Sequence, residues 1–397
     1  MKWTSKGHQF DDLGMLLKDK NQVYIYGAAL KGGKLFELLR SCNKWLNWEI
    51  AFVDADKCKQ KDGYLGTQVL SPEELFNSPK ENHFVIVAAS PFNTVEITDI
   101  LLKNGYVSDF NCFAYEKFMN FILPIHFVYN YDMVFFSSQS ILPSTVCNLN
   151  CESCLNFNPY IKNHITDDFE LVKNDIDSFF TAIDYIDRFQ ITGGEPFLYK
   201  ELGNLISYIE ENYRDKIFNL ETVTNGSVIP SDELCKILKE NDVHVILDDY
   251  RNALKDGDKK FNEIMNKFNE YGIQYTPNFV TEWFNIYPKG IDHSNWSKKE
   301  LIDHYDACNN PFSTIRDKKI YACNYAHYAE KAGLIVENSN DYFDLSKFTP
   351  KMKKELVEFR LGYTNEGYVD FCKTCAGWVS INKNMVPVAK QIKRNNA

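Results

Sequence analysis

Three cysteines lie close together in the middle of the chain, and their thiolates could bind iron or zinc. Cys147, Cys151 and Cys154 are separated by three and then by two residues. Three thiolates in one tight loop leave the fourth iron of a 4Fe-4S cluster without a protein ligand, so that iron can bind a chelating small molecule. A zinc site or three unrelated thiols are the alternatives, because C-x2-C pairs also bind zinc.

Two glycine-containing motifs follow the cysteines, and each comes directly after a predicted strand. The first consists of Thr192, Gly193, Gly194, Glu195 and Pro196, and the second of Thr224, Asn225 and Gly226. Glycines let the backbone approach a ligand closely, and the Glu195 carboxylate can accept hydrogen bonds from an ammonium group. The second motif, taken alone, is equally compatible with an ordinary turn.

In this order the three motifs resemble those of the radical S-adenosylmethionine (AdoMet) superfamily. The resemblance implies that Cys147, Cys151 and Cys154 hold a 4Fe-4S cluster whose open iron binds the methionyl amino and carboxylate groups. It also implies that the TGGEP residues contact the methionyl part of AdoMet, and that Thr224 and Asn225 lie against its ribose. Many members carry an aromatic residue just before the third cysteine, whereas this chain has Ser153 there.

Four further cysteines, at positions 308, 323, 372 and 375, stand in the C-terminal part of the chain. Cys308, Cys323, Cys372 and Cys375 have 14, 48 and two residues between successive members. Four thiolates can fully ligate a second 4Fe-4S cluster, and a structural zinc site is the alternative. The pattern resembles the twitch domain, a shortened SPASM domain with one auxiliary cluster. That family commonly has Asp-Gly in the hairpin before the second cysteine, where this chain has Asp317-Lys318.

The N-terminal part alternates short apolar runs with helical patterns, which predicts a small parallel α/β unit. Strands are expected at 23–26, 48–53 and 84–88. Gly27 to Gly32 is a G-x-A-x-x-G variant after the first strand, and Asp54 ends the second. A nucleotide site is one interpretation, and a docking or dimerisation domain without a cofactor is the other. Together with Gly63 and Ser71-Pro72-Glu73, these segments resemble the Rossmann-like C-terminal domain of sugar C-methyltransferases.

From about residue 141 the strand and helix alternation continues, which predicts a parallel barrel with its chemistry at the strand C-termini. Strands are expected at 140–146, 189–191, 220–224, 243–247 and 273–279. The predicted fold class is therefore α/β, with a Rossmann-like parallel sheet at 1–120, a connector at 121–140, a partial (β/α)6 radical AdoMet barrel at 141–290 and a small twitch/SPASM-like iron-sulfur domain at 291–397.

Asp248, Asp249 and Tyr250 end one of these predicted strands. Carboxylates and a phenol at a strand end can position substrate hydroxyl groups or accept a proton, so we expect them to be catalytic. A solvated turn is the alternative for the two aspartates.

Composition limits the partners. Lys and Arg total 44 against 54 Asp and Glu, a net charge of −10, which lacks the basic character of nucleic-acid-binding surfaces. The N-terminus carries no apolar signal region, and no stretch approaches the ~20 apolar residues of a membrane-spanning helix. We therefore expect a cytoplasmic protein that binds neither nucleic acid nor membrane.

The stretch from Cys151 through Asn158-Pro159-Tyr160 to the TGGEP motif resembles radical AdoMet proteins of bacterial surface-polysaccharide pathways. That resemblance implies a carbohydrate substrate, for which a nucleotide sugar is the expected form. A 5′-deoxyadenosyl radical would remove hydrogen from a carbinol carbon, with the second cluster as electron acceptor and a flavodoxin- or ferredoxin-type protein as reductant. Epimerisation, with Cys235 as a hydrogen donor, and SPASM-type peptide modification are the alternatives.

Overall fold

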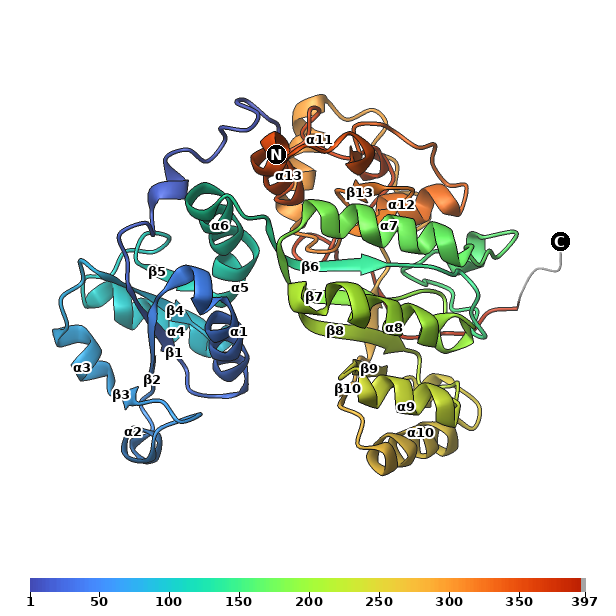
Figure 1. The fold of residues 1–397 in the computed structure, drawn as a ribbon. Helices are drawn as coiled ribbons and strands as arrows, with labels where there is room; N and C mark the ends of the chain where they lie inside the picture. The colour runs from blue at the N-terminus through green and yellow to red at the C-terminus, as the bar shows by residue number, and fades with distance from the viewer. Residues whose placement is uncertain (394–397) are drawn as a thin grey trace. The chain divides into compact units, whose positions relative to one another are not determined.

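The chain forms two compact units in the computed structural model, which describes residues 1–393. One unit consists of residues 10–135, and the other joins residues 1–9 to the chain from Phe136 onward. The last four residues of the predicted 291–397 domain lie outside the described part. Figure 1 shows the order of the elements in each unit.

Residues 10–135 form a five-stranded sheet with the order β3-β2-β1-β4-β5. All of its neighbouring strands are parallel, which confirms the expected parallel α/β unit. Two short strands, β3 and β5, were not predicted, because two or three residues are too few to show the alternation of apolar and polar side chains that indicates a strand. The strands are β1 (Gln22–Tyr26), β2 (Glu49–Val53), β3 (Val69–Leu70), β4 (His83–Val87) and β5 (Cys112–Ala114). The helices are α1 (Leu30–Leu46), α2 (Lys57–Asp62), α3 (Pro72–Asn77), α4 (Pro91–Lys103), α5 (Tyr115–Lys117) and α6 (Leu123–Tyr131).

The segment 121–140, expected as a connector, is instead made of regular elements. It contains α6, which continues a π-helical turn at Phe118–Ile122, and most of strand β6 (Phe135–Ile141). The residues from Leu123 to Val128 are all buried. A helix that is buried on every side has no polar face, so its sequence shows no amphipathic period.

The second unit is built on an eight-stranded sheet with the order β10-β9-β8-β7-β6-β12-β13-β14. Strands β7 to β10 are mutually parallel, and β12 is parallel to β6. The sheet therefore continues from the predicted barrel into the predicted C-terminal domain, with β12 next to β6. Besides β6, its strands are β7 (Tyr185–Ile191), β8 (Ile217–Thr224), β9 (His244–Asp248), β10 (Tyr275–Asn278), β12 (Thr314–Arg316), β13 (Lys319–Tyr321) and β14 (Tyr342–Asp344).

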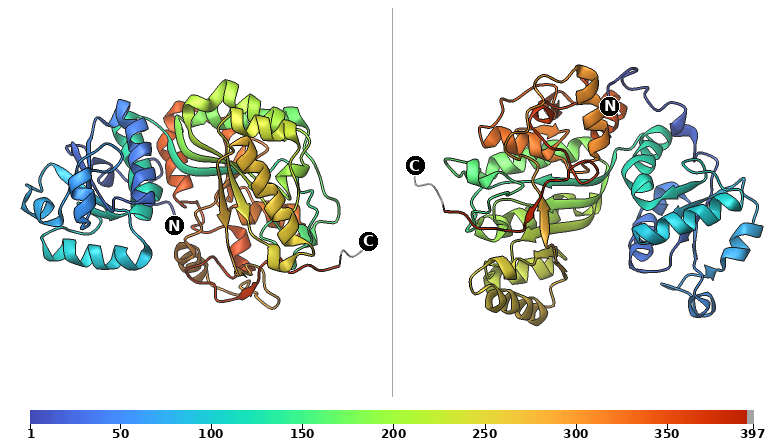
Figure 2. Two further views of the ribbon diagram at one scale, coloured as in Figure 1. Left: turned by 90° about the horizontal axis from the view of Figure 1, so that it is seen from below. Right: turned by 180° about the vertical axis from the view of Figure 1, so that it is seen from behind.

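Four helices alternate with the strands and lie along one side of this sheet (Figures 1 and 2). They are α7 (Phe169–Ala182), α8 (Leu202–Tyr213), α9 (Asp232–Glu240) and α10 (Gly257–Tyr271). The packing is apolar: Phe189 of β7 has its ring centroid 5.6 Å from that of Phe179 and 5.2 Å from that of Phe180 on α7. The residues that alternate with Phe189 along β7 must therefore point to the other side of the sheet.

Strand β6 corrects the strand expected at 140–146. It begins at Phe135 and ends at Ile141, so the chain from Leu142 to Cys147 is a loop. Pro143 lies in that loop, and a proline cannot donate to a sheet ladder. The three cysteines therefore stand on a long irregular segment rather than directly at the end of a strand.

In the described residues after 290, where the sequence shows no clear period, there are three α-helices and several short strands. The helices are α11 (Lys298–Cys308), α12 (Asn324–Lys331) and α13 (Lys353–Arg360), and β11 (Glu282–Phe284) pairs with β15 (Met385–Pro387). The N-terminal segment is bound to α13, because the buried Glu358 carboxylate accepts hydrogen bonds from Trp3 Nε1 at 2.7 Å and from the Gly7 N–H at 2.8 Å.

The hairpin β12–β13 has an unusual turn. Asp317 and Lys318 both have positive φ, at 52° and 56°, as a type I′ turn requires. The buried Asp175 carboxylate on α7 accepts hydrogen bonds from both backbone N–H groups, at 3.1 Å and 2.6 Å. A carboxylate from a distant helix thus stabilises a turn that the sequence of the hairpin itself does not favour.

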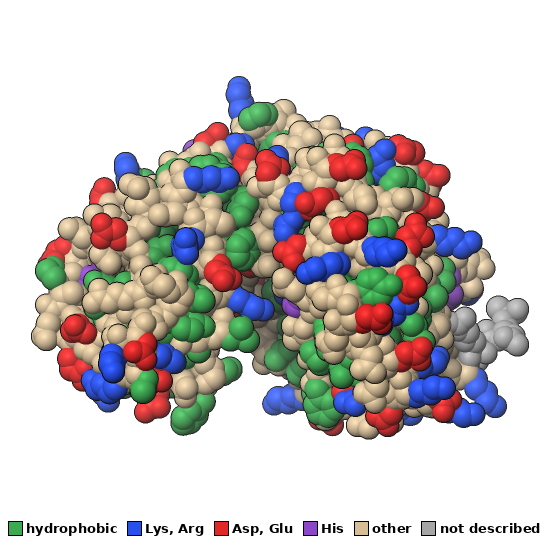
Figure 3. All heavy atoms as spheres, turned by 60° about the horizontal axis from the view of Figure 1, so that its bottom comes forward, with side chains coloured by type: hydrophobic (Ala, Val, Ile, Leu, Met, Phe, Trp, Pro, Cys, Tyr) green, Lys and Arg blue, Asp and Glu red, His purple; other side chains and the backbone are tan. Residues whose placement is uncertain are grey.

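Basic and acidic side chains are interspersed on the face drawn in Figure 3. In the described part of the chain, no helix combines the length and the apolar character needed to cross a bilayer.

Candidate functional site

The three thiols of the 147–154 loop lie near one another. Burial is the main cause that raises the pKa of Cys147 to about 11 and that of Cys151 to about 12, and the charge of Cys154 contributes to both shifts. None of the eleven cysteines forms a disulfide. Among residues 1–393, no three His, Cys, Asp or Glu side chains converge closely enough to hold a single metal ion.

Hydrogen-bond donors are directed at two of these sulfurs. The Leu149 N–H lies 3.4 Å from Cys147 Sγ, and Gln391 Nε2 lies 3.1 Å from Cys151 Sγ. Amide N–H groups aimed at sulfur suit thiolates that ligate an iron-sulfur cluster, because they stabilise negative charge on the ligand. The donor set and its surroundings therefore fit a 4Fe-4S cluster.

Glu195 joins the TGGEP motif to the Thr224-Asn225-Gly226 turn. Its carboxylate, 1 % exposed, accepts hydrogen bonds from Thr224 Oγ1 and from the Asn225 N–H, both at 2.8 Å, and from the Phe197 N–H at 3.1 Å. Burial raises the pKa of Glu195 to about 7, although these donors act in the opposite direction. Because the Glu195 carboxylate already accepts three hydrogen bonds within the protein, the role that the structure shows for it is to hold the two motifs together. Its expected contact with an ammonium group stays a prediction.

Asn225 connects these two motifs to the cysteine loop. Its side-chain Nδ2 donates to Asn148 Oδ1 at 3.0 Å and lies 3.7 Å from Cys147 Sγ. Three motifs that are far apart in the sequence thus form one continuous site.

The two glycines of TGGEP are needed for packing within the protein. A Cβ on Gly194 would lie 2.3 Å from the Val146 carbonyl oxygen, and one on Gly193 would lie 2.9 Å from that of Ser144. Here the backbone of the motif crosses the segment that leads to Cys147, with the Glu195 N–H donating to the Val146 carbonyl at 2.8 Å. At its two ends, the Thr192 N–H donates to the Ile141 carbonyl at 2.8 Å, and Pro196 begins a 3-10 turn.

The predicted catalytic residues divide into two groups. Tyr250 donates its hydroxyl to Asp248 Oδ2 at 2.7 Å, and Asn278 donates to Asp248 Oδ1 at 2.7 Å. Burial raises the pKa of Asp248. Asp249 instead forms a bidentate pair with Arg251, at 2.8 and 2.7 Å, which lowers its pKa.

Only the first of these groups lies beside the cysteine loop. Tyr250 packs with Cys151 and Ala389 in one buried cluster. Burial is the main cause that raises the pKa of Tyr250, Asp248 is the next, and the charges of Cys151 and Cys154 contribute less. Its ring lies edge-on to Trp283, with the centroids 5.4 Å apart. Asp248 and Tyr250 are thus placed near the candidate cluster, whereas Asp249 is engaged in an ion pair.

A row of polar side chains, not among the site residues expected from the sequence, crosses the sheet face opposite the helices. Gln190 Nε2 donates to Glu221 Oε2 at 3.3 Å, and His244 contacts Glu221 Oε1 at 3.4 Å. The other nitrogen of His244 lies 2.9 Å from Thr276 Oγ1, and Arg188 Nε lies 3.8 Å from Glu221 Oε2. The signal was the alternation of Arg188 and Gln190 with Phe189 and Ile191, which indicates a strand with one polar face.

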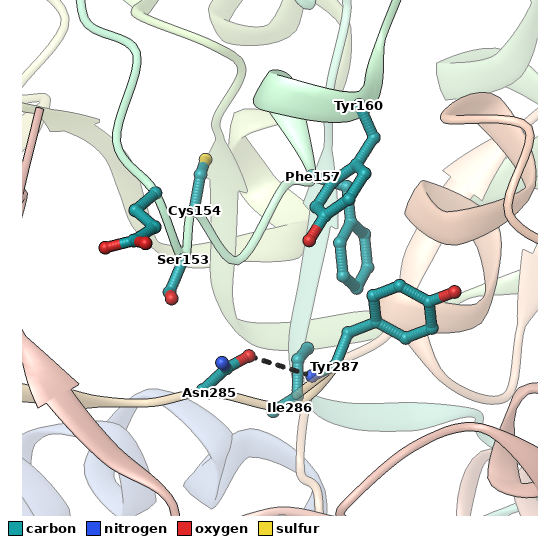
Figure 4. A pocket seen from close by; sticks show the side chains of 8 residues that line it. Ser153, Cys154, Phe157, Tyr160, Asn285, Ile286 and Tyr287 are labelled. Atoms are coloured by element: carbon teal, nitrogen blue, oxygen red, sulfur yellow. Dashed lines mark hydrogen bonds between the residues drawn. The ribbon is translucent and has the colours of Figure 1, made fainter. Parts of the chain in front are cut away.

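A pocket opens next to Cys154 (Figure 4). Tyr160 and Tyr287 form part of its wall with their ring centroids 5.7 Å apart, and Figure 4 shows the Tyr160 hydroxyl directed into the pocket. Ser153, where an aromatic residue was expected from the resemblance, lies across from this hydroxyl. The complete lining is Glu152, Ser153, Cys154, Phe157, Tyr160, Asn285, Ile286 and Tyr287.

The four C-terminal cysteines, separated by up to 48 residues, are also brought together. Burial is the main cause that raises the pKa of Cys372, and the charges of Cys375, Cys323 and Cys308 all contribute in the same direction, which shows that the four thiols lie near one another. Donors again point at the sulfurs: the Trp378 N–H lies 3.2 Å from Cys308, the Gly377 N–H 3.2 Å from Cys375, and Asn310 Nδ2 3.3 Å from Cys323. These thiols have the same kind of environment as the first set.

An aromatic contact links the two sets of cysteines. Phe157 donates its N–H to the Cys154 carbonyl at 2.9 Å, and its ring centroid lies 5.6 Å from that of Phe371, the residue before Cys372. Cys235, by contrast, is fully buried on α9, and its charged neighbours are Lys267, Asp232 and Glu270 on α9 and α10. It therefore lies on the helical side of the sheet, away from the polar row.

In the candidate nucleotide loop of the N-terminal unit, the groups that would bind a nucleotide form hydrogen bonds and an ion pair within the protein. Gly27 has φ 118°, and a Cβ there would lie 2.7 Å from the Ala88 carbonyl oxygen. The Ala28 N–H, which a phosphate would use, donates to Asp54 Oδ2 at 2.9 Å, and Lys59 pairs with the same oxygen at 3.2 Å. The amide and the carboxylate that a dinucleotide site would supply are thus bonded to each other.

Comparison with known families identifies part of the chain. Residues 141–275 match the model of the radical SAM superfamily. This stretch carries the cysteine loop, the TGGEP motif and Thr224-Asn225-Gly226, so the expected radical AdoMet domain is confirmed. A radical SAM domain implies AdoMet and a 4Fe-4S cluster as cofactors. No curated protein matches the chain.

Several solved structures resemble the chain only distantly. "Native anSMEcpe with bound AdoMet and Kp18Cys peptide" is 16% identical, with a TM-score of 0.38, over 61% of this chain and 89% of that one. BtrN in complex with AdoMet and 2-DOIA is 15% identical, with a TM-score of 0.39, over 63% and 98%. Streptococcus suis SuiB bound to S-adenosylmethionine is 20% identical, with a TM-score of 0.31, over 57% and 52%.

Proposed function

We propose that this chain is a radical AdoMet enzyme that oxidises an alcohol group of a carbohydrate. The observation that carries the proposal is the single site formed by the cysteine loop, Glu195 and the Thr224-Asn225 turn inside the radical SAM domain. Cys147, Cys151 and Cys154 would hold the AdoMet-binding cluster. That cofactor pair supplies hydrogen-atom abstraction from a bound substrate.

The polar row supports a hydroxylated substrate. Carboxylate, amide, imidazole and hydroxyl groups from β7 to β10 face the side without helices, and Thr276 is exposed there. The interior of a parallel barrel is ordinarily filled with branched apolar side chains. Gln190, Glu221 and His244 instead offer both donors and acceptors, as the hydroxyl groups of a sugar require.

Asp248 is the residue we propose as proton acceptor. Conversion of a carbinol to a carbonyl removes the hydroxyl proton as well as the C–H hydrogen, so a base must lie near the reacting carbon. Burial raises the pKa of Asp248, and Tyr250 and Asn278 hold its two oxygens in place.

Cys308, Cys323, Cys372 and Cys375 would hold a second 4Fe-4S cluster, which supplies one-electron redox chemistry. Their mutual proximity and the three N–H donors directed at their sulfurs support this assignment. Phe157, which follows Cys154, packs with Phe371, Cys372 and Cys375 in one core, and this supports a second cluster close to the first.

Anaerobic incubation of the reconstituted protein with AdoMet, a reductant and a panel of nucleotide sugars tests the function. Mass spectrometry should show a product lighter by about two daltons, formed together with 5′-deoxyadenosine. An unchanged mass with deuterium uptake from heavy water would instead indicate epimerisation. If the panel gives no product while a peptide is modified, the carbohydrate assignment is wrong.

A matched pair of variants tests the polar row. Glu221→Ala should raise the KM for the sugar at least tenfold, because Gln190, His244 and Arg188 all lose their shared partner. AdoMet cleavage without sugar should stay at the parent rate. Glu240→Ala, on the exposed side of α9, should change neither value.

A further inference from the structure

The chain from Val388 to Ile392, which we name the C-terminal strap, lies along the three-cysteine loop. It follows β15, and its backbone pairs with the loop in an antiparallel bridge at Cys151 and Gln391. The Glu152 N–H donates to the Lys390 carbonyl at 2.8 Å, and the Ile392 N–H donates to the Asn150 carbonyl at 3.0 Å. Two segments separated by about 240 residues in the sequence are therefore held in fixed register.

Gln391 is the strap residue whose side chain donates a hydrogen bond to a thiol of this loop. Its Oε1 accepts a hydrogen bond from the Asn150 N–H at 2.9 Å. Its Nε2 donates to Cys151 Sγ at 3.1 Å and to the Ala389 carbonyl at 2.7 Å. Since one end faces a donor and the other faces two acceptors, only this orientation of the amide satisfies all three contacts.

The strap also encloses this side of the loop. Ala389 is fully buried and packs with Cys151 and Tyr250, with Val388 and Trp283 around them. Lys390, in contrast, forms an ion pair with Glu152 at 2.7 Å in which both side chains are at least half exposed. The strap thus combines a buried contact to sulfur with an exposed contact between charges.

We propose that Gln391 is a positioning residue of the three-cysteine site, whose amide N–H sets how readily the cluster held through Cys151 accepts an electron. This inference rests on the proposed function, because it assumes that the loop holds a 4Fe-4S cluster. Reduction adds negative charge that is shared with the thiolate sulfurs. An N–H donor at one sulfur stabilises that charge, so it raises the reduction potential.

Three substitutions in the full-length, reconstituted protein separate this role from its alternatives. Gln391→Leu removes the donor, and Gln391→Glu replaces it with an acceptor of the same shape that carries a negative charge. Lys390→Gln makes the same change in net charge one residue away, but it leaves the donor in place. Its exposed ion pair should contribute little.

The measurement is an anaerobic redox titration followed by electron paramagnetic resonance. The signal of the first cluster is the one missing from a Cys147→Ala, Cys151→Ala, Cys154→Ala variant, so its assignment does not require AdoMet. We expect a more negative midpoint potential for Gln391→Leu, a still more negative one for Gln391→Glu, and the parent value for Lys390→Gln. The response of the same signal to AdoMet tests the proposed function separately.

Two outcomes would overturn the inference. One is a Gln391→Leu protein with full iron content and the parent potential, which would make the strap a purely structural element. The other is an equal shift in Lys390→Gln and Gln391→Glu, which would assign the effect to net charge. If Gln391→Leu fails to load its cluster, the midpoint potentials of Gln391→Glu and Lys390→Gln are compared instead, because Glu preserves the shape of the Gln side chain. A more negative potential in Gln391→Glu alone supports the inference, and equal potentials in the two variants overturn it.

Discussion

At the scale of single residues, the surroundings of the thiols explain how seven cysteines can be used as two sets. Burial raises the pKa of each of the seven, so the free thiols are protonated near neutral pH in the absence of metal. Metal binding must therefore displace protons, and the N–H donors around the sulfurs offset part of that cost. The remaining cysteines have no such grouping: Cys235 is buried on α9, and Cys58 is exposed.

Removal of one set should leave the other intact. The parent protein should hold about eight irons after anaerobic reconstitution, and a Cys147→Ala, Cys151→Ala, Cys154→Ala variant about half of that number. The variant should lose AdoMet cleavage altogether, since the proposed second cluster, with four thiolate ligands, would have no open iron. Iron analysis and quantification of 5′-deoxyadenosine measure both effects. Cys58→Ala is the control, and retained cleavage in the triple variant would refute the assignment.

Glu195 connects the TGGEP motif to the Thr224-Asn225 turn, and we propose that the shape of the AdoMet site depends on it. Glu195→Ala leaves Thr224 Oγ1 and the Asn225 N–H without their shared acceptor. We expect AdoMet binding to weaken by about 1.5–3 kcal/mol, roughly 10- to 150-fold in the dissociation constant, with both clusters in place. Isothermal titration calorimetry measures this change. Glu201→Gln, beyond the same 3-10 turn, should bind as the parent does, and equal affinity in Glu195→Ala would contradict the role.

At the scale of elements, the hairpin β12–β13 shows how one element compensates for the sequence of another. Lys318 adopts a left-handed conformation that costs a side-chain-bearing residue about 1–2 kcal/mol. The Asp175 carboxylate of α7 offsets this cost through two charge-assisted hydrogen bonds to the turn. The hairpin precedes Cys323, so the position of one candidate cluster ligand depends on a helix of the radical SAM domain.

Replacement of Lys318 by glycine should relieve the turn. Lys318→Gly is expected to raise the free energy of unfolding by about 0.5–1 kcal/mol, after the greater entropy of glycine in the unfolded chain is taken into account. Lys319→Gly, in strand β13 where φ is not positive, should lower it instead. Urea unfolding followed by circular dichroism compares the two. A loss of stability in both variants would show that the turn is not strained.

At the scale of the whole molecule, the second unit is one continuous structure and not a barrel with a separate appendage. Strands β12 to β14 extend the sheet of the radical SAM domain, and residues 1–9 and the C-terminal strap pack on the same unit. The buried Asp341, next to β14, belongs to this joined region. Both of its carboxylate oxygens accept a hydrogen bond from the Asp370 N–H, at 3.1 and 3.0 Å, in the segment that carries Cys372.

Asp341 should make the stability of this unit depend on pH. Burial raises its pKa to about 7, despite the N–H donor, whereas an aspartate in an unfolded chain titrates near pH ~4. Between these values the folded protein keeps a proton that the unfolded chain has lost. Stability should therefore fall as the pH rises from about 4 to about 7 and level off above that range.

Asp341→Asn removes this titration. The slope of unfolding free energy against pH should become flatter between about pH 5 and pH 7 in the variant. Asp215→Asn, at an exposed site, should keep the slope of the parent. Identical slopes in the parent and in Asp341→Asn would show that the carboxyl group titrates normally.

The sequence by itself indicated the radical SAM domain and many of the strands and helices that carry its motifs. The cysteine spacing, the TGGEP motif and the strand ends beside them are local features, since a cluster loop or a strand-to-turn transition is encoded within a few residues. Only the tertiary structure decided which groups these residues contact. Glu195 meets Thr224, Asp175 holds Lys318, and Gln391 reaches Cys151 across segments 29 to 240 residues apart. Such contacts arise from the packing of one element on another. The local periodicity of a sequence predicts the type of an element but does not indicate which distant residue its side chains will contact.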